Sequence, residues 1–250
     1  MHILLQCIYY SDIKTEFTRI CPDLKFGGES TLTKQRKSLK PPGLTIVARI
    51  TGQEELPFME AVQKVRTESG KKFYANKFLH LTLLGLFNHK RKHSHSHAND
   101  IINSSKEFIE QKHYACMTFK FNLIRLGAFY RYGRSCDGNS DGTLVAMADT
   151  KSPEVNKFNI LGDDLACHLR INFPSIFYPD IHLRLKREHQ TVWSTLGYFN
   201  QTDFDIDEKL VPILEELKSF NAVVNVSQLE FRSYENRSLE KSNLIDVIKV

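Results

Sequence analysis

The chain has 250 residues, of which 41% are hydrophobic and 25% charged, so it can bury a substantial core and is neither a miniprotein nor a wholly disordered chain. Its 34 Lys and Arg residues exceed its 29 Asp and Glu residues. The net charge of +5 favours anionic ligands such as phosphates, without the one-sign field of a dedicated duplex-DNA binder. The five cysteines have no CxxC spacing, which argues against a disulfide framework or a cysteine zinc site and favours a reducing compartment.

The N-terminal segment, residues 1–43, is interpreted as an extension. Residues 1–10 are apolar, but they lack a basic segment, and Asp12 and Lys14 end the run well short of the roughly 20 residues that a membrane span needs. We therefore expect a strand or a loose arm there, in a cytoplasmic protein. The glycines, prolines and basic cluster of residues 11–43 fit the same interpretation.

Strands and helices alternate in the part of the chain that follows. Residues 44–50 form a short β-branched run, and residues 54–69 place apolar side chains at helical spacing before a glycine that fits a C-cap. Residues 78–87 are too short and too apolar for a surface helix, so they predict a mostly buried strand. A helix is predicted over 99–112, and the alternation of apolar and polar residues over 117–123 predicts a half-buried strand.

The alternation resumes after a turn-rich loop at residues 133–142. Residues 154–170 set apolar side chains along one helical stripe, and residues 189–199 have the β-branched and aromatic content of a strand. A helix is predicted over 205–219, and Pro212 indicates either a kink in this helix or a later start of it. The other strands predicted in this half span residues 143–148, 222–231 and 244–250.

Two predicted strands carry the same kind of tetrad, about a hundred residues apart and each in its own α/β half. The first reads His80-Leu81-Thr82-Leu83 and the second His189-Gln190-Thr191-Val192. Residues i and i+2 of a strand project from one face, so each motif presents an imidazole beside a hydroxyl. Each strand therefore supplies half of a candidate site.

Two imidazoles around one cavity suit the chemistry of a phosphodiester. One ring accepts a proton from the attacking water while the other donates a proton to the departing alkoxide, and imidazole titrates near neutrality. The threonine hydroxyls can hydrogen-bond the non-bridging oxygens, where charge develops as phosphorus becomes five-coordinate. The motif pair thus predicts acid–base cleavage of a phosphodiester.

The paired H-x-T motifs resemble those of the 2H phosphoesterase superfamily, which includes RNA 2′,3′-cyclic phosphodiesterases of the bacterial LigT type. The resemblance covers residues 44–250. It implies an α+β fold, a single domain of two pseudo-twofold-related α/β lobes whose sheets line a central cleft. By this resemblance, His80 and His189 take the catalytic positions and Thr82 and Thr191 the phosphate-binding positions.

The same resemblance implies an activity and its partners. The expected activity is that of a metal-independent phosphoesterase, a hydrolase that acts on a cyclic or 2′,5′-linked phosphodiester. The expected partner is an RNA end or a small cyclic nucleotide, and no metal or other cofactor is expected. We also expect a monomer that does not bind membranes.

A short echo follows each motif: LGLF at residues 84–87 and LGYF at residues 196–199. The echoes differ by three residues in their distance from the motif, which predicts a bulge or a longer strand in the second copy. Phe87 and Tyr198, near the ends of the two strands, are either core residues or surfaces on which a nucleobase stacks.

Two other classes of function remain open. The same site can bind RNA or a nucleotide without turnover, and the His-rich loop over residues 89–97 can hold a metal ion. No carboxylate or cysteine stands near that loop, so a solvated loop, or one that brings cations to a phosphate, is the expected alternative. Arg184, Lys186 and Arg187 precede the second motif and either flank the site or are only solvated.

Overall fold

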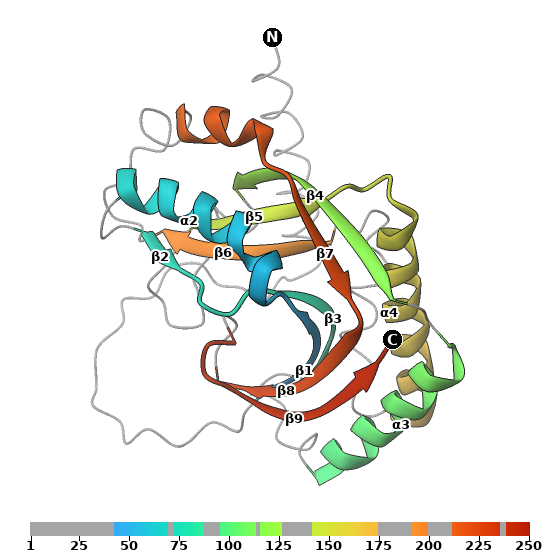
Figure 1. Cartoon of the computed structure of the whole chain (residues 1–250). Helices are drawn as coiled ribbons and strands as arrows, with labels where there is room; N and C mark the ends of the chain where they lie inside the picture. Colours follow the sequence, from blue (N-terminus) through green and yellow to red (C-terminus); the bar gives the residue numbers. More distant parts are fainter. Residues whose placement is uncertain are drawn as a thin grey trace, which may run out of the picture. The chain divides into compact units, whose positions relative to one another are not determined.

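The computed structural model describes eight stretches of the chain (Figure 1), all within a compact unit that spans residues 39–250. The extension predicted over residues 1–43 lies outside them except for Gly43, so it stays a prediction. The described residues are 43–69, 73–87, 96–113, 116–126, 142–174, 192–199, 212–235 and 239–250.

The described strands form two antiparallel sheets. Sheet A has four strands in the order β3-β1-β8-β9, and sheet B has five in the order β2-β6-β5-β4-β7. Sheet A consists of β1 (Gly43–Arg49), β3 (His80–Phe87), β8 (Gln228–Tyr234) and β9 (Ser242–Lys249). Sheet B consists of β2 (Phe73–Ala75), β4 (Met117–Leu126), β5 (Gly142–Ala148), β6 (Trp193–Phe199) and β7 (Ala222–Val226).

The helices lie where the apolar periodicity predicts them. Ser152 caps α4, because its hydroxyl accepts the Glu154 backbone N–H at 3.2 Å, and Pro153 occupies the first turn, where its missing N–H costs nothing. Residues 212–216 are helical and lead into the 3₁₀ turn η5 (Leu217–Ser219). The other helical elements are η1 (Gly52–Glu55), α2 (Leu56–Ser69), α3 (Ala98–Gln111) and α4 (Pro153–Asn172).

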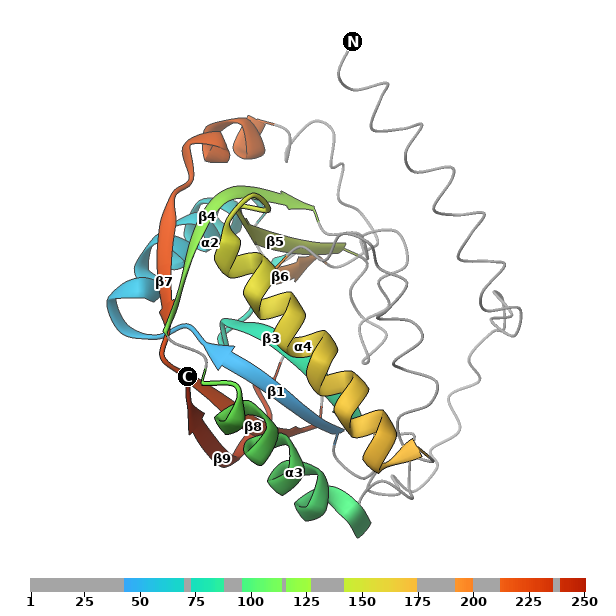
Figure 2. The same cartoon turned by 90° about the vertical axis from the view of Figure 1, so that its right-hand side faces the viewer.

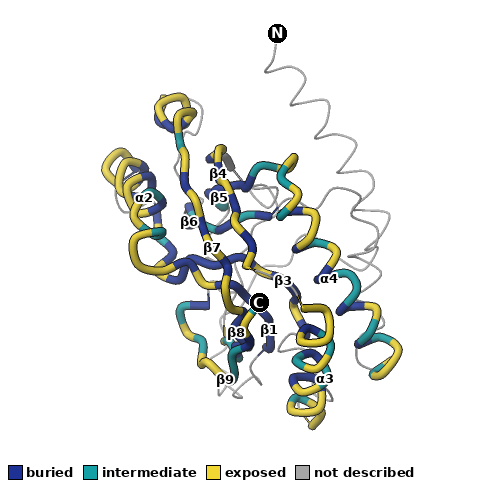
Figure 3. The backbone as a smooth tube through the Cα atoms, turned by 45° about the vertical axis from the view of Figure 1, so that its right-hand side comes forward, coloured by how far each residue is buried: buried dark blue, intermediate teal, exposed yellow. Residues whose placement is uncertain are grey.

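The helices pack against one side of the sheets and enclose the core with them. Two phenylalanines of β4 in sheet B contact the helices through edge-to-face ring pairs. Phe121 packs against Phe58 of α2, and Phe119 packs against Phe158 of α4. Helix α4 also contacts β3 of sheet A, and Figure 2 shows it running across both sheets. Each helix has buried residues on one side and exposed residues on the other (Figure 3). Among the described residues, no helix packs on the opposite sides of the sheets, so a site can lie there.

The α+β class is confirmed, but the two sheets are not the two halves of the sequence. Strands β1 and β3 pair with β8 from the end of the chain, while β2 and β4 from the first half join sheet B. The strand predicted over residues 222–231 is in fact two, β7 and β8, which lie in different sheets on either side of Ser227. The residue pattern is apolar and alternating on both sides of that crossing, so it carries no mark of the change of sheet.

The strand that carries the first motif, β3, and the strand that follows the second motif, β6, end matching units of the fold. Strand β1 leads through α2 and the short strand β2 to its antiparallel neighbour β3, and β5 leads through α4 to its antiparallel neighbour β6. The bulge predicted in the second copy is present, since the pairing shifts at Leu196 of β6, but β3 shifts twice. One shift of β3 falls at Leu83, which lets the consecutive Leu83 and Leu84 both be buried while Thr82 faces outward.

No helix among the described stretches combines the length and the apolar character that crossing a bilayer would require.

Candidate active site

One face of sheet A, which we call the polar face, carries the first motif. Cross-strand neighbours point to the same side of a sheet, and Arg49 of β1 pairs with His80 of β3. The pairing continues across β1 into β8, where Glu230 and Arg232 share this face. The alternate residues of these strands point to the helices and form the core. The polar face thus carries His80, Thr82, Arg49, Glu230 and Arg232, with Val47 and Thr45 of β1 between them.

His80 is the first residue of β3 and is buried, with 8% of its surface exposed. Its Nδ1 lies 2.8 Å from the carbonyl oxygen of Phe78. Burial lowers the pKa of His80 from 6.5 to about 4; the bond to the Phe78 carbonyl opposes this shift, and the charge of Arg232 adds to it. The ring is therefore neutral at physiological pH.

The hydrogen bond to Phe78 sets the tautomer of this ring. A carbonyl oxygen only accepts, so Nδ1 must carry the proton and donate it. In the neutral ring, Nε2 then has the free lone pair and can accept a proton from a bound molecule. His80 is thus held in the form that a general base needs.

A buried asparagine connects His80 to the other sheet. Asn76 is fully buried, and its side-chain amide donates to the carbonyl oxygens of Phe78, at 3.2 Å, and of Thr195 in β6, at 3.0 Å. Its backbone N–H donates to the Leu196 carbonyl at 2.9 Å. The carbonyl that orients His80 is therefore linked through Asn76 to β6, the strand that follows the second motif.

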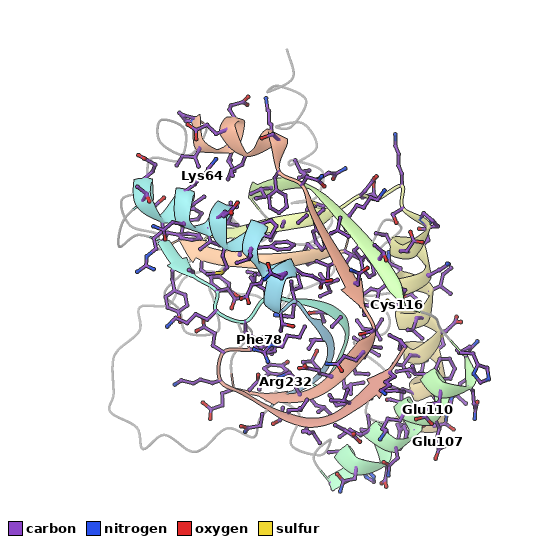
Figure 4. The ribbon with its side chains drawn as sticks, viewed as in Figure 1. Lys64, Phe78, Glu107, Glu110, Cys116 and Arg232 are labelled. Carbon is purple, nitrogen blue, oxygen red and sulfur yellow. The ribbon has the colours of Figure 1, made fainter. Side chains whose placement is uncertain are left out.

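Two cations and a phenyl ring surround this part of the polar face. The guanidinium of Arg49 lies 5.0 Å from the centroid of the Phe78 ring, and that of Arg232 lies 4.6 Å from it. The Phe78 ring also packs against the His80 imidazole, with centroids 5.5 Å apart. Figure 4 shows Phe78 and Arg232 side by side, where the β2–β3 connection meets sheet A.

The loop between β8 and β9 holds the segment that leads into β3. Glu240 accepts hydrogen bonds from the Tyr74 hydroxyl and from the Lys77 backbone N–H, the latter at 2.9 Å. Next to it, Leu239 is buried against Phe78 and Val47 in a small apolar cluster separate from the main core. These contacts restrict the backbone on which the orientation of His80 depends.

Of the four site residues predicted from sequence, the structure describes two. Thr82 is exposed and lies two residues from His80 on the same strand face, as the motif predicts. His189 and Thr191 lie outside the described residues, so their meeting with His80 stays a prediction. Strand β6 begins at Trp193, two residues after Thr191, and β3 and β6 contact each other.

Of the other candidate residues predicted from the sequence, the structure describes only some. Tyr198 of β6 is half-buried, and the Phe87 side chain lies outside the described residues. His97 pairs with Asp100 at 3.5 Å, so the expectation that no carboxylate stands near the His-rich loop is wrong at its C-terminal end. The rest of that loop up to residue 95, and the cations predicted at 184–187, lie outside the described residues. In the stretches that the structure does describe, no group of three or more His, Cys, Asp or Glu side chains is placed to hold a metal ion.

Sequence reasoning missed Arg49, Phe78, Glu230 and Arg232. A weak signal for Arg49 exists, because it is the one charged residue of the run LTIVARI. Glu230 and Arg232 alternate with buried Leu229 and Phe231, a pattern that also fits an ordinary half-exposed strand. Only the pairing of β8 with β1 brings these charges near His80.

The comparisons with known proteins give a likeness of fold. The structure of E. coli LigT in its apo form is 13% identical, with 84% of this chain and 98% of LigT covered and a TM-score of 0.47. TT0787 of Thermus thermophilus is 12% identical, with coverages of 83% and 97% and a TM-score of 0.49. A structure described as a phosphoesterase is 14% identical, with coverages of 84% and 98% and a TM-score of 0.45. No family model and no curated protein matches the chain.

The pKa of His80 predicts how stability depends on pH. The unfolded ring takes up a proton near pH 6.5 and the folded ring only near pH 4, so the unfolded state binds more protons between these values. The free energy of unfolding should therefore fall as the pH drops through this range, by about 3 kcal/mol in total. Urea unfolding at a series of pH values measures it.

The matched control for this measurement is His80→Asn, which keeps a side-chain donor near the position of Nδ1 but does not titrate. Other groups, such as Asp246, whose pKa is lowered by its hydrogen bond from Lys106, contribute equally to both proteins and cancel in the difference. If the free energies of unfolding of the wild type and of His80→Asn differ by the same amount at every pH between 6.5 and 4, His80 is not desolvated in the folded protein.

Proposed function

We propose that this chain is a phosphoesterase that hydrolyses a cyclic or 2′,5′-linked phosphodiester of an RNA end or a small nucleotide, using two imidazoles and no metal. The observation that carries the proposal is the state of His80. Its Nδ1–H is bound to the Phe78 carbonyl at 2.8 Å, which leaves the lone pair on Nε2, and Thr82 lies beside it on the same strand face.

The proposed site is completed by the second motif. Thr191 stands two residues before β6, and β6 is linked to the His80 segment through Asn76. We propose that His189 and Thr191 face His80 and Thr82 across a phosphate held between the sheets. The two threonine hydroxyls would then donate to the non-bridging oxygens as charge develops on them.

In the proposed reaction on a 2′,3′-cyclic phosphate, His80 acts as the base. A water molecule transfers a proton to Nε2 of His80 as its oxygen forms a bond to phosphorus. The bond from phosphorus to one ribose oxygen breaks, and protonated His189 donates its proton to that oxygen. The products are one phosphomonoester and one free ribose hydroxyl, and a final proton exchange with solvent restores both rings.

The low pKa of His80 keeps the ring unprotonated, as a base must be, but it also makes the ring a weak base. A base whose pKa is about 4 is unprotonated at neutral pH, but it has little driving force to take a proton from water. A bound dianionic or monoanionic phosphate offsets the positive potential of Arg232 and thereby raises the pKa of His80. The ring should accordingly be a stronger base with substrate bound than in the free protein.

A panel of substrates tests the proposal. The purified protein is incubated with 2′,3′-cyclic nucleotides, ADP-ribose cyclic phosphate and a 2′,5′-linked adenylate dinucleotide, with and without EDTA, and the products are followed by ³¹P NMR. We expect turnover of at least one of these, unaffected by EDTA, with a bell-shaped dependence of kcat/KM on pH. Salt-sensitive RNA binding without any product would instead support the binding function.

A further inference from the structure

The two arginines that stack on Phe78 differ in what neutralises them. Arg232 is buried, with 9% of its surface exposed, and its Nη1 donates to Glu230 Oε2 at 2.6 Å. Its Nε donates to the Ser242 hydroxyl at 3.0 Å. Arg232 therefore already has an anionic partner and a hydroxyl partner within the fold.

Arg49 also lies over the Phe78 ring, but it is exposed. Within the described part of the chain, its one side-chain interaction is the contact with the Phe78 ring, 5.0 Å from the centroid, and no carboxylate there forms an ion pair with it. The ring restrains the guanidinium without neutralising its charge. A planar fork of donors held in this way suits the oxygens of a phosphate.

The Arg49 side chain lies next to that of His80, the proposed base. Arg49 is the last residue of β1 and pairs directly with His80, so both side chains leave the sheet on the polar face. Directly opposed residues of an antiparallel pair have Cβ atoms about 4.5–5.5 Å apart. An anion that contacts the Arg49 guanidinium can therefore also reach the His80 ring.

We propose that Arg49 binds the phosphate of the substrate beside His80, so that the anion contacts the guanidinium and lies on the face that carries His80 and Thr82. This inference rests on the proposed function for the identity of the substrate, but the binding of a phosphate group can be measured without turnover. Arg49 would neutralise charge on the non-bridging oxygens, while Arg232 and Glu230 only hold Phe78 and the strand in place.

The experiment titrates inorganic phosphate into the full chain and follows the His80 ring by NMR with labelled histidine. The variants are Arg49→Gln, which removes the charge, and Arg49→Lys, which keeps it without the planar fork. The control is Arg66→Gln, which removes an equal charge from the exposed side of α2, the helix packed on sheet B. Because Arg49 is exposed, all these variants should fold, and thermal unfolding checks this.

Loss of a hydrogen bond to a charged group corresponds to about a 10- to 100-fold weaker affinity. We expect a phosphate Kd raised by about this factor in Arg49→Gln, a smaller rise in Arg49→Lys, and the wild-type Kd in Arg66→Gln. Phosphate binding at His80 that is equal in wild type and Arg49→Gln would overturn the inference. So would an equal loss in Arg66→Gln, or no phosphate binding by the wild type.

Turnover of adenosine 2′,3′-cyclic phosphate separates the two proposals. If the wild type has no activity on any tested diester, yet its phosphate binding depends on Arg49, the proposed function fails and the inference about Arg49 stands. If the wild type is active and Arg49→Gln has the same kcat/KM and phosphate Kd, the function stands and the inference fails.

Discussion

Replacing His80 by asparagine is expected to lower kcat on a cyclic phosphodiester by a factor of about 10² to 10⁴, the range that general acid–base groups contribute. Asparagine places an amide N–H near the position of Nδ1, so it can keep the bond to the Phe78 carbonyl while removing Nε2. The variant therefore tests the loss of the base and not the loss of the fold. Steady-state kinetics at neutral pH give both kcat and kcat/KM.

The control is the same substitution at His168, which lies on α4 and contacts the Ser104 hydroxyl at 2.9 Å, away from the polar face. We expect wild-type kinetics from His168→Asn. A loss of kcat and kcat/KM by equal factors in His80→Asn would mark an interaction made only in the transition state. Wild-type rates from His80→Asn on every diester that the protein cleaves would remove His80 from the reaction.

The second large effect concerns the fold. Arg232→Met should lower the free energy of unfolding by about 3–5 kcal/mol, because it leaves the buried carboxylate of Glu230 without its partner. Methionine keeps much of the side-chain volume against Phe78, so the unpaired charge dominates the loss. Urea unfolding at neutral pH, followed by circular dichroism, measures it.

A double variant separates the charge from the packing. Glu230→Gln with Arg232→Met removes both charges, and we expect it to recover most of the stability that the single variant loses. Lys218→Met breaks an ion pair with Glu215 in which both side chains are more than half exposed, and it should cost about 0–1 kcal/mol. Equal losses from the single and the double variant would show that the ion pair is not what stabilises this face.

Much of the local structure follows from the residues alone. The strand predicted at 117–123 is part of β4, and the stripe that predicts a helix over 154–170 is that of α4, because burial against one neighbour imposes a fixed period on either element. The three-residue strand β2 was not predicted, since it is too short to show a period. Its Phe73 lies where a Cβ on Gly197 would clash, so the glycine of the second echo permits the close pairing of β2 with β6.

The residue pattern was enough to predict most of the described strands and helices, and it placed an imidazole and a hydroxyl on one face of β3, because the two-residue period of a strand is a local property of the backbone. The neighbours of each strand, β8 beside β1 and both β2 and β5 beside β6, became known only from the folded chain. Strand pairing depends on backbone hydrogen bonds between distant segments, which leave little trace in the side-chain pattern. For that reason the tautomer of His80, its burial and the two arginines around Phe78 emerged from the fold and not from the motif.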